Sequence, residues 1–143
     1  MSAGRLRAAI AALSLAGAGI AAYLVYTRYS GAAIFCSTGG CESVQNSKYA
    51  EVAGIPVAVL GLIGYAAILV TAAAPGPMSA AVGVALSAVG VAFSGYLLYA
   101  QLGPIDAICQ WCVANDAVIS LLATACLWRF LREQLLLARP APR

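Results

Sequence analysis

Uncharged apolar stretches divide the chain into four candidate membrane-spanning segments. Residues 8–27 carry no charge, and residues 52–105 form a second uncharged stretch that is too long for one span. A spanning helix needs about 20 mostly apolar residues. The sequence Pro75-Gly76-Pro77 interrupts the second stretch, and such residues end helices and favour tight turns. The pattern therefore predicts spans at about 8–28, 55–74, 78–102 and 109–131.

The composition agrees with a chain that is embedded in lipid. Of the 143 residues, 63% are hydrophobic and 9% are charged, whereas soluble domains usually carry about 25% charged residues. So few charges exclude an ordinary soluble enzyme, a disordered chain and a basic nucleic-acid binder. The spans are rich in Ala and Gly, whose small side chains let helices pack closely in a membrane. We therefore expect an all-α integral membrane protein, a four-transmembrane-helix bundle that forms a single domain over residues 1–143.

The placement of basic residues predicts that both termini are cytoplasmic. Six of the eight basic residues precede the first span or lie at or beyond the end of the last: Arg5, Arg7, Arg129, Arg132, Arg139 and Arg143. The positive-inside rule places these ends in the cytoplasm, and four spans require both termini on one side. The loop of residues 29–54 then faces outward. A cleaved signal peptide is the alternative for the first segment, but its apolar run is longer than the usual stretch of about 7–15 residues.

Four of the five cysteines fall on the outward side, where disulfides form and persist. Cys36 and Cys41 lie in the first outward loop, and two glycines between them favour a mobile strap. Cys109 and Cys112 form a C-x-x-C pair at the start of the last span, where a helix N-terminus lowers a thiol pKa. Two pairs on one side allow thiol–disulfide exchange between them. Cys126, about 20 Å further along the helix, is expected to serve packing.

Two structural alternatives for the outward cysteines remain open. One is a permanent disulfide between Cys36 and Cys41 beside an idle C-x-x-C pair. The other is a zinc site made by all four thiolates, which would place net negative charge at a lipid boundary. The chain contains no histidine, so it has neither an imidazole base nor a histidine metal ligand. We therefore expect thiol chemistry without a metal.

Three stretches around these cysteines carry a family resemblance. They are CSTGGCESVQNSKYA at residues 36–50, GIPVAVLGLIGY at residues 54–65 and CQWC at residues 109–112. In combination they resemble the vitamin K epoxide reductase family, over nearly the whole chain. The resemblance is to a bacterial single-domain homologue without a fused thioredoxin-like domain. It implies a four-helix bundle around a quinone, menaquinone or ubiquinone, with the C-x-x-C pair at the outward end.

The resemblance also implies a role for each residue of the site. Cys112 would lie closest to the quinone and reduce it, and Cys109 would exchange with the loop pair. Cys41 would meet Cys109, and Cys36 would meet an external thiol protein. Ser47 matches a serine that hydrogen-bonds the quinone ring oxygen, and its alternative is a helix cap or a solvated hydroxyl.

Asp116 departs from the vertebrate pattern, which has a tyrosine four residues after the C-x-x-C pair. It should share a helix face with Cys112, and an acid within a span is a functional candidate by default. We expect it to contact the quinone or relay protons, with a partly hydrated carboxylate as the alternative. Residues 56–60 also lack the hydrogen-bonding asparagine of vertebrate relatives. The absence of this asparagine favours quinone reduction over epoxide reduction.

The function implied is that of a membrane thiol:quinone oxidoreductase. It would reoxidise a separate periplasmic thioredoxin-fold protein of the DsbA type, from the outward face of the inner or plasma membrane. There are three alternatives, of which the first belongs to the same class and the other two to different classes. A Dsb-type quinone-linked oxidase has its cysteine pairs in the reverse order, and a small transporter usually needs a carboxylate deep inside a span. A non-catalytic membrane protein with a structural disulfide remains the third.

Overall fold

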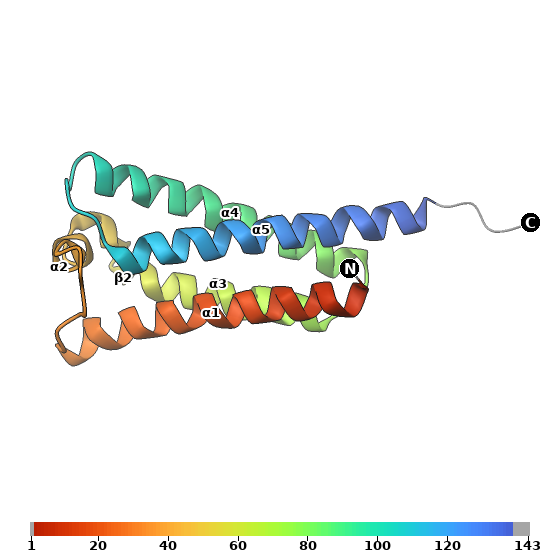
Figure 1. The fold of residues 1–143 in the computed structure, drawn as a ribbon, viewed down its shortest axis with the longest axis horizontal. Coiled ribbons are helices and arrows are strands. Elements are labelled where there is room, and N and C mark those ends of the chain that lie inside the picture. The colour runs from red at the N-terminus through yellow and green to blue at the C-terminus, as the bar shows by residue number, and fades with distance from the viewer. Residues whose placement is uncertain (1, 139–143) are drawn as a thin grey trace, which may run out of the picture.

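The computed structural model describes residues 2–138, which are mostly helical. The long helices are α1 (Ala3–Ser30), α3 (Val57–Ala73), α4 (Pro77–Leu102) and α5 (Gln110–Leu137). The connection from α1 to α3 contains α2 (Cys41–Gln45), a 3-10 helix η1 (Lys48–Ala50), β1 (Glu51–Val52) and β2 (Ile55–Pro56). The long helices run side by side, and these connecting elements gather at one end of the bundle (Figure 1). Helices α1, α4 and α5 are long and apolar enough to cross a membrane, and α3 is an apolar helix of 17 residues.

The helices differ from the predicted spans mainly at their ends. Helix α1 begins at Ala3 because the Ser2 hydroxyl caps it, accepting a hydrogen bond from the Arg5 N–H at 3.3 Å. It ends before Gly31, whose φ of 68° is the left-handed conformation that commonly ends a helix. The Pro-Gly-Pro turn separates α3 from α4 as expected, and Pro77 occupies the first turn of α4.

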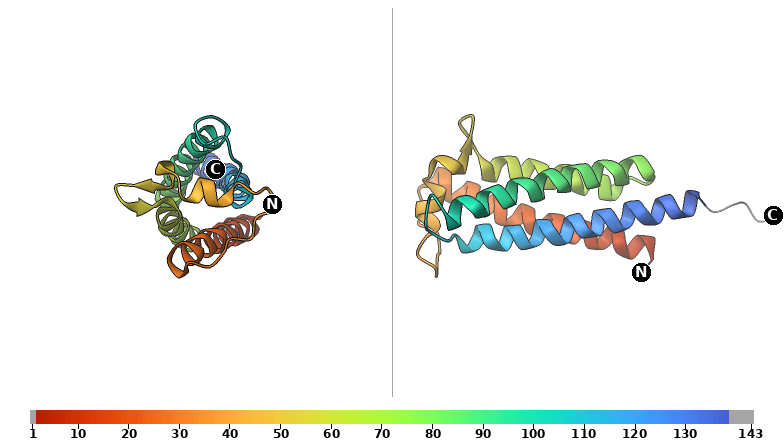
Figure 2. Two further views of the ribbon diagram at one scale, coloured as in Figure 1. Left: turned by 90° about the vertical axis from the view of Figure 1, so that its left-hand side faces the viewer. Right: turned by 90° about the horizontal axis from the view of Figure 1, so that it is seen from above.

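A short hairpin between η1 and α3 was not predicted. β1 and β2 pair antiparallel, with Glu51 opposite Pro56 and Val52 opposite Ile55. Ala53 and Gly54 have positive φ values of 52° and 80°, as a two-residue hairpin turn requires. The hairpin projects sideways from the end of the bundle (Figure 2). Strands of two residues carry too few positions for an alternating pattern, so the sequence does not reveal them.

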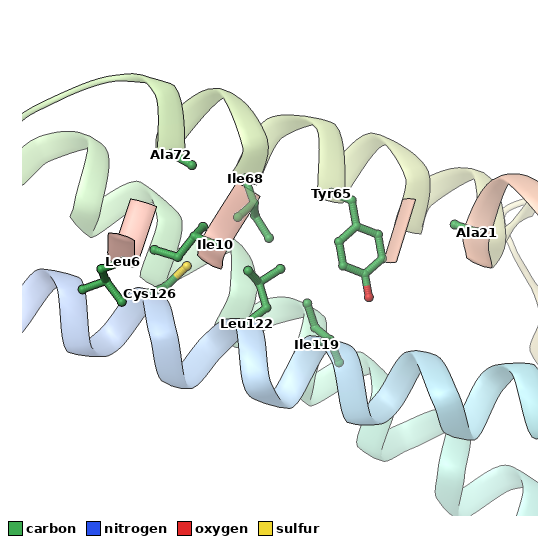
Figure 3. Close-up of a cluster of buried hydrophobic side chains, with 9 residues drawn as sticks. All are labelled: Leu6, Ile10, Ala21, Tyr65, Ile68, Ala72, Ile119, Leu122 and Cys126. Atoms are coloured by element: carbon green, nitrogen blue, oxygen red, sulfur yellow. The ribbon is translucent and has the colours of Figure 1, made fainter. Parts of the chain in front are cut away.

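The main core lies where α1, α3 and α5 meet. Figure 3 shows its buried side chains, which are Leu6, Ile10, Ala21, Tyr65, Ile68, Ala72, Ile119, Leu122 and Cys126. Gly17 of α1 allows the Tyr65 ring of α3 to pack directly against the backbone of α1. A Cβ atom at position 17 would lie 2.2–2.7 Å from carbons of that ring. Cys126 is 3% exposed, in keeping with its expected packing role. Large apolar side chains such as Val70, Val89 and Leu135 are exposed on the outside of the bundle, as suits contact with lipid.

Two arginines satisfy the carbonyl end of α3. The last carbonyls of a helix have no partner within that helix, and leaving them unpaired in lipid is costly. Arg129 is 4% exposed and donates to the carbonyls of Thr71 and Ala74 at 2.7 and 2.8 Å. Arg7 donates to the carbonyls of Ala72, at 2.7 Å, and Ala73. From the sequence, Arg129 is predicted to mark the cytoplasmic end of the last span. In the structure it is buried, and its hydrogen bonds link α5 to the end of α3. Arg139 and Arg143 lie outside the described residues.

Candidate functional site

The two cysteine pairs lie together at the end of the bundle where α2 crosses it (Figure 1). Cys36 and Cys41 are joined by a disulfide. Cys109 and Cys112 are separate thiols whose sulfur atoms are 2.8 Å apart. Cys41 and Cys109 are both fully buried and belong to one apolar cluster. The fold therefore brings together two pairs that are more than 60 positions apart in the sequence.

Hydrogen bonds dock the loop of residues 35–41 against the start of α5. The Phe35 carbonyl accepts from Trp111 Nε1 at 2.7 Å, and the Phe35 N–H donates to the Tyr23 hydroxyl at 3.0 Å. Further along, the Ser37 N–H donates to Gln110 Oε1 at 2.8 Å. The Thr38 hydroxyl donates to the Ile108 carbonyl at 2.7 Å. The sequence favours a mobile strap here, but in the structure the strap is held on both sides.

Gly40 is a second reason why this loop lies so close to the C-x-x-C pair. A Cβ atom at Gly40 would lie 2.6 Å from the Ile108 carbonyl oxygen and 2.7 Å from its nitrogen. Both contacts are with backbone, which cannot rotate away as a side chain can. Glycine therefore permits the close contact between the loop and the residue that precedes Cys109.

The start of α5 places Cys109 where a thiolate is stabilised. Cys109 is the N-cap of α5, and its sulfur accepts the Cys112 N–H at 3.3 Å. Its own N–H donates to Gln101 Oε1 at 2.8 Å, which fixes it to the end of α4. A hydrogen bond from the Cys112 thiol, supported by backbone N–H groups, lowers the pKa of the Cys109 thiol below its ordinary 9.0. The N-cap position therefore favours the thiolate form of Cys109.

A cavity of about 310 Å³ opens next to Cys112 and is lined mostly by apolar side chains from every long helix and from α2 and η1. Cys112 lines this cavity and Cys109 does not. The predicted site residues Ser47 and Asp116 also line it. The structure thus places Cys112, Ser47 and Asp116 around one apolar space, with Cys109 on the side of the loop pair.

Two buried polar atoms of residues that line this cavity have no partner among residues 2–138. They are Gln101 Nε2 and Asp116 Oδ2. The Gln101 amide oxygen accepts the Cys109 N–H, and only an amide oxygen can accept such a bond. The Gln101 atom left without a partner is therefore the Nε2 donor. Buried polar groups are normally paired, so an unpaired donor and an unpaired carboxylate oxygen at one cavity are consistent with a polar ligand.

Three further polar side chains that line the cavity, Ser47, Tyr65 and Asn115, are bonded to the protein. The Ser47 hydroxyl donates to the Val44 carbonyl at 2.7 Å, so a bond from it to a ligand oxygen would require rotation of the side chain. The Tyr65 hydroxyl donates to Asn115 Oδ1 at 2.8 Å. The amide oxygen of Asn115 thus has its partner in Tyr65. Among residues 2–138, no group of three histidine, cysteine or acidic side chains is placed to hold a metal ion.

Comparison with known proteins shows which family the chain belongs to. A model of the vitamin K epoxide reductase family matches residues 8–127, which include both cysteine pairs and most of the long helices. The chain belongs to the vitamin K epoxide reductase family. The thiol-disulfide oxidoreductase LTO1 of Arabidopsis thaliana is 43% identical to it over 49 residues. That match covers 33% of this chain and 13% of the Arabidopsis protein.

Three residues of this vitamin K epoxide reductase family member were not singled out from its sequence. Gln101 is the only glutamine in the uncharged stretch of residues 52–105, and an isolated amide in a predicted span is a usable signal. Gln45 follows Cys41 by four positions, so the two would share a face if a helix began there. Tyr65 ends one of the matching stretches, but only the structure shows that it contacts Asn115.

Proposed function

We propose that this protein is a membrane thiol:quinone oxidoreductase that oxidises an extracytoplasmic thioredoxin-fold protein. The observation that carries the proposal is the position of the two pairs. The loop pair packs against Cys109, while Cys112 alone of the four outward cysteines opens onto an apolar cavity. Electrons would therefore enter at Cys36, pass through Cys41 to Cys109 and leave from Cys112.

Each transfer between the pairs is a thiol–disulfide exchange. The reduced partner protein would attack Cys36 of the loop disulfide, and a second thiol of the partner would then release it, leaving both loop cysteines as thiols. Cys41 would next attack the Cys109–Cys112 disulfide at Cys109 and expel Cys112 as a thiolate. Attack by Cys36 on Cys41 would restore the loop disulfide and leave Cys109 as a thiolate.

The cavity fits a quinone headgroup in both size and polarity. Ligand sites are commonly about 300–1,000 Å³ and apolar, with few polar groups. A quinone ring is flat and apolar and has carbonyl oxygens that accept hydrogen bonds, and Gln101 Nε2 is an unpaired donor. When bound, a quinone accepts two electrons and two protons. Asp116, with an unpaired buried oxygen in the same lining, is the candidate to hold one of these protons.

Ser47 remains a candidate quinone ligand within this proposal. Its hydroxyl lines the cavity but is bonded to the Val44 carbonyl. Ser47 would have to exchange that bond for one to the quinone oxygen, whereas Gln101 would not have to give up any bond.

The proposal includes both termini in the cytoplasm and the cysteine pairs in the periplasm or its equivalent. The start of α1 and the end of α5 lie at the end of the bundle opposite to α2 (Figure 1). Arg7 and Arg129 are at that end, around the carbonyl end of α3. Basic residues favour the cytoplasmic side, and disulfides persist on the other.

The test is a quinone-reduction assay with purified protein in detergent. Protein, a reduced thioredoxin-fold partner and a soluble quinone are mixed, and quinone absorbance is followed. Cys112→Ala should abolish turnover, and Cys36→Ala should block the protein partner while retaining activity with a small dithiol. Cys126→Ala is the matched control and should stay near wild type. A wild-type protein without thiol-dependent loss of quinone would refute the proposal and favour a structural disulfide.

A further inference from the structure

Gln45 places one amide group against both sulfurs of the C-x-x-C pair. Its Nε2 atom lies 3.5 Å from Cys112 Sγ and 4.0 Å from Cys109 Sγ. These distances are those of N–H donation to sulfur, and Gln45 lines the same cavity as Cys112. Gln45 is also the last residue of α2, the helix that begins at Cys41. The donor and the loop cysteine that packs near Cys109 therefore belong to one short element.

The position of α2 is fixed at both of its ends. At its start, Cys41 is fully buried and joined to Cys36. At its end, the Gln45 carbonyl accepts from Arg28 Nη1 at 3.0 Å, and the same guanidinium binds Asn46 and Glu51. The Gln45 amide is thus presented to the sulfurs by a backbone that is held in place.

The two sulfurs of the C-x-x-C pair have different hydrogen-bond donors. Cys109 Sγ, at the helix N-cap, accepts the backbone N–H and the thiol of Cys112. Cys112 lies further into α5, where backbone N–H groups donate to carbonyls of the preceding turn and are not free to bond a side chain. The Val113 N–H, for example, donates to the Cys109 carbonyl at 3.0 Å. Within residues 2–138, the N–H that reaches Cys112 Sγ is that of Gln45. The chain has no histidine that could supply another.

We propose that Gln45 is a catalytic hydrogen-bond donor that stabilises Cys112 as a thiolate facing the cavity. The inference rests on the proposed function and concerns one step of it. When the Cys41 thiolate attacks Cys109, the Cys41–Cys109 bond forms and the Cys109–Cys112 bond breaks. The electron pair of the broken bond leaves on Cys112, in a cavity lined mostly by apolar groups. A donor already aimed at that sulfur stabilises the charge as it develops.

The test measures the reactivity of Cys112 in the full-length chain without quinone or partner. Cys109→Ser and Cys126→Ala leave Cys112 as the only free thiol, with the loop disulfide intact, and serine preserves an N-cap at position 109. In this background, Gln45→Met should slow alkylation by iodoacetamide at pH 7.5 by about tenfold, because the thiolate fraction falls. Gln45→Lys supplies a charged donor and should react at least as fast as the parent. Ser43→Ala, an exposed position on the same helix, is the control and should not change the rate.

Turnover of the otherwise native chain separates this inference from the proposed function. Gln45→Met should lower kcat with a small dithiol by about tenfold and leave the KM for the dithiol unchanged. Unchanged alkylation in Gln45→Met would overturn the role of Gln45, even if the wild type reduces quinone normally. If Gln45→Met slows alkylation but the wild type does not reduce quinone, the hydrogen bond from Gln45 to Cys112 is supported and the proposed function is refuted. Equal slowing in Gln45→Met and Gln45→Lys would show that the side chain fills space and does not donate.

Discussion

Replacement of Gly17 by alanine tests the packing of α1 against Tyr65, which lines the cavity. A methyl group at Gly17 would lie 2.2 Å from the nearest carbon of the Tyr65 ring, whereas carbons pack best about 3.5–4.0 Å apart. The ring must therefore move by more than about 1 Å. Such overpacking costs about 1–3 kcal/mol, and loss of the bond from Tyr65 to Asn115 adds about 1 kcal/mol. Gly17→Ala should thus destabilise the fold by about 2–4 kcal/mol.

Gly19 of the same helix provides the matched control. A Cβ atom at Gly19 would have no neighbour within 4 Å, so Gly19→Ala changes helix propensity alone, and by the same amount as at position 17. The assay is thermal unfolding in detergent, where about 3 °C per kcal/mol predicts a midpoint roughly 6–12 °C lower for Gly17→Ala than for Gly19→Ala. Because Tyr65 lines the cavity, Gly17→Ala should also raise the KM for quinone. Equal midpoints in the two variants would refute the close packing of Tyr65 on α1.

Three further predictions concern other parts of the structure. Arg129→Met leaves the buried carbonyl of Thr71 and the partly buried carbonyl of Ala74 without their donor, at about 1–3 kcal/mol for a buried group. It should lower the unfolding midpoint well below that of the exposed control Arg5→Met; similar midpoints would contradict the burial of Arg129. Gly40→Ala should lower turnover driven by the reduced thioredoxin-fold partner by about tenfold or more but leave the oxidation of a pre-reduced C-x-x-C pair by quinone unchanged, and equal loss in both assays would place the defect outside the loop. Because the hydrogen bond from Cys112 lowers the pKa of Cys109 below its ordinary 9.0, the Cys109 thiolate persists to a lower pH than that of an ordinary thiol. The single-turnover rate of quinone reduction by the pre-reduced protein should therefore level off before pH 9, whereas a rate that still rises up to pH 9 would indicate an ordinary thiol.

Local features of the sequence sufficed to predict the helical stretches and the candidate chemistry. The limits of α4 follow from the Pro-Gly-Pro turn at one end and the glycine and proline of residues 103–104 at the other. The two cysteine pairs and Asp116 stand out because charged and thiol side chains are rare in so apolar a chain. These signals depend on neighbours within one or two helical turns, so they can be read without knowing how the helices pack.

Contacts between distant segments could be decided only by the tertiary structure. Arg129 appears in the sequence as one of several basic residues near an end, yet it is buried because the carbonyls of Thr71 and Ala74 need donors that α3 cannot supply. Gln45 and Gln101 are ordinary amides until the fold places one against the sulfurs and the other against the Cys109 N–H. Hydrophobic periodicity determines that a helix forms, but the choice of which side chains meet is made by the packing of whole helices. The cysteines of the proposed chemistry are thus visible in the sequence, whereas the amides that contact them are recognised only from the packing of α2, α4 and α5.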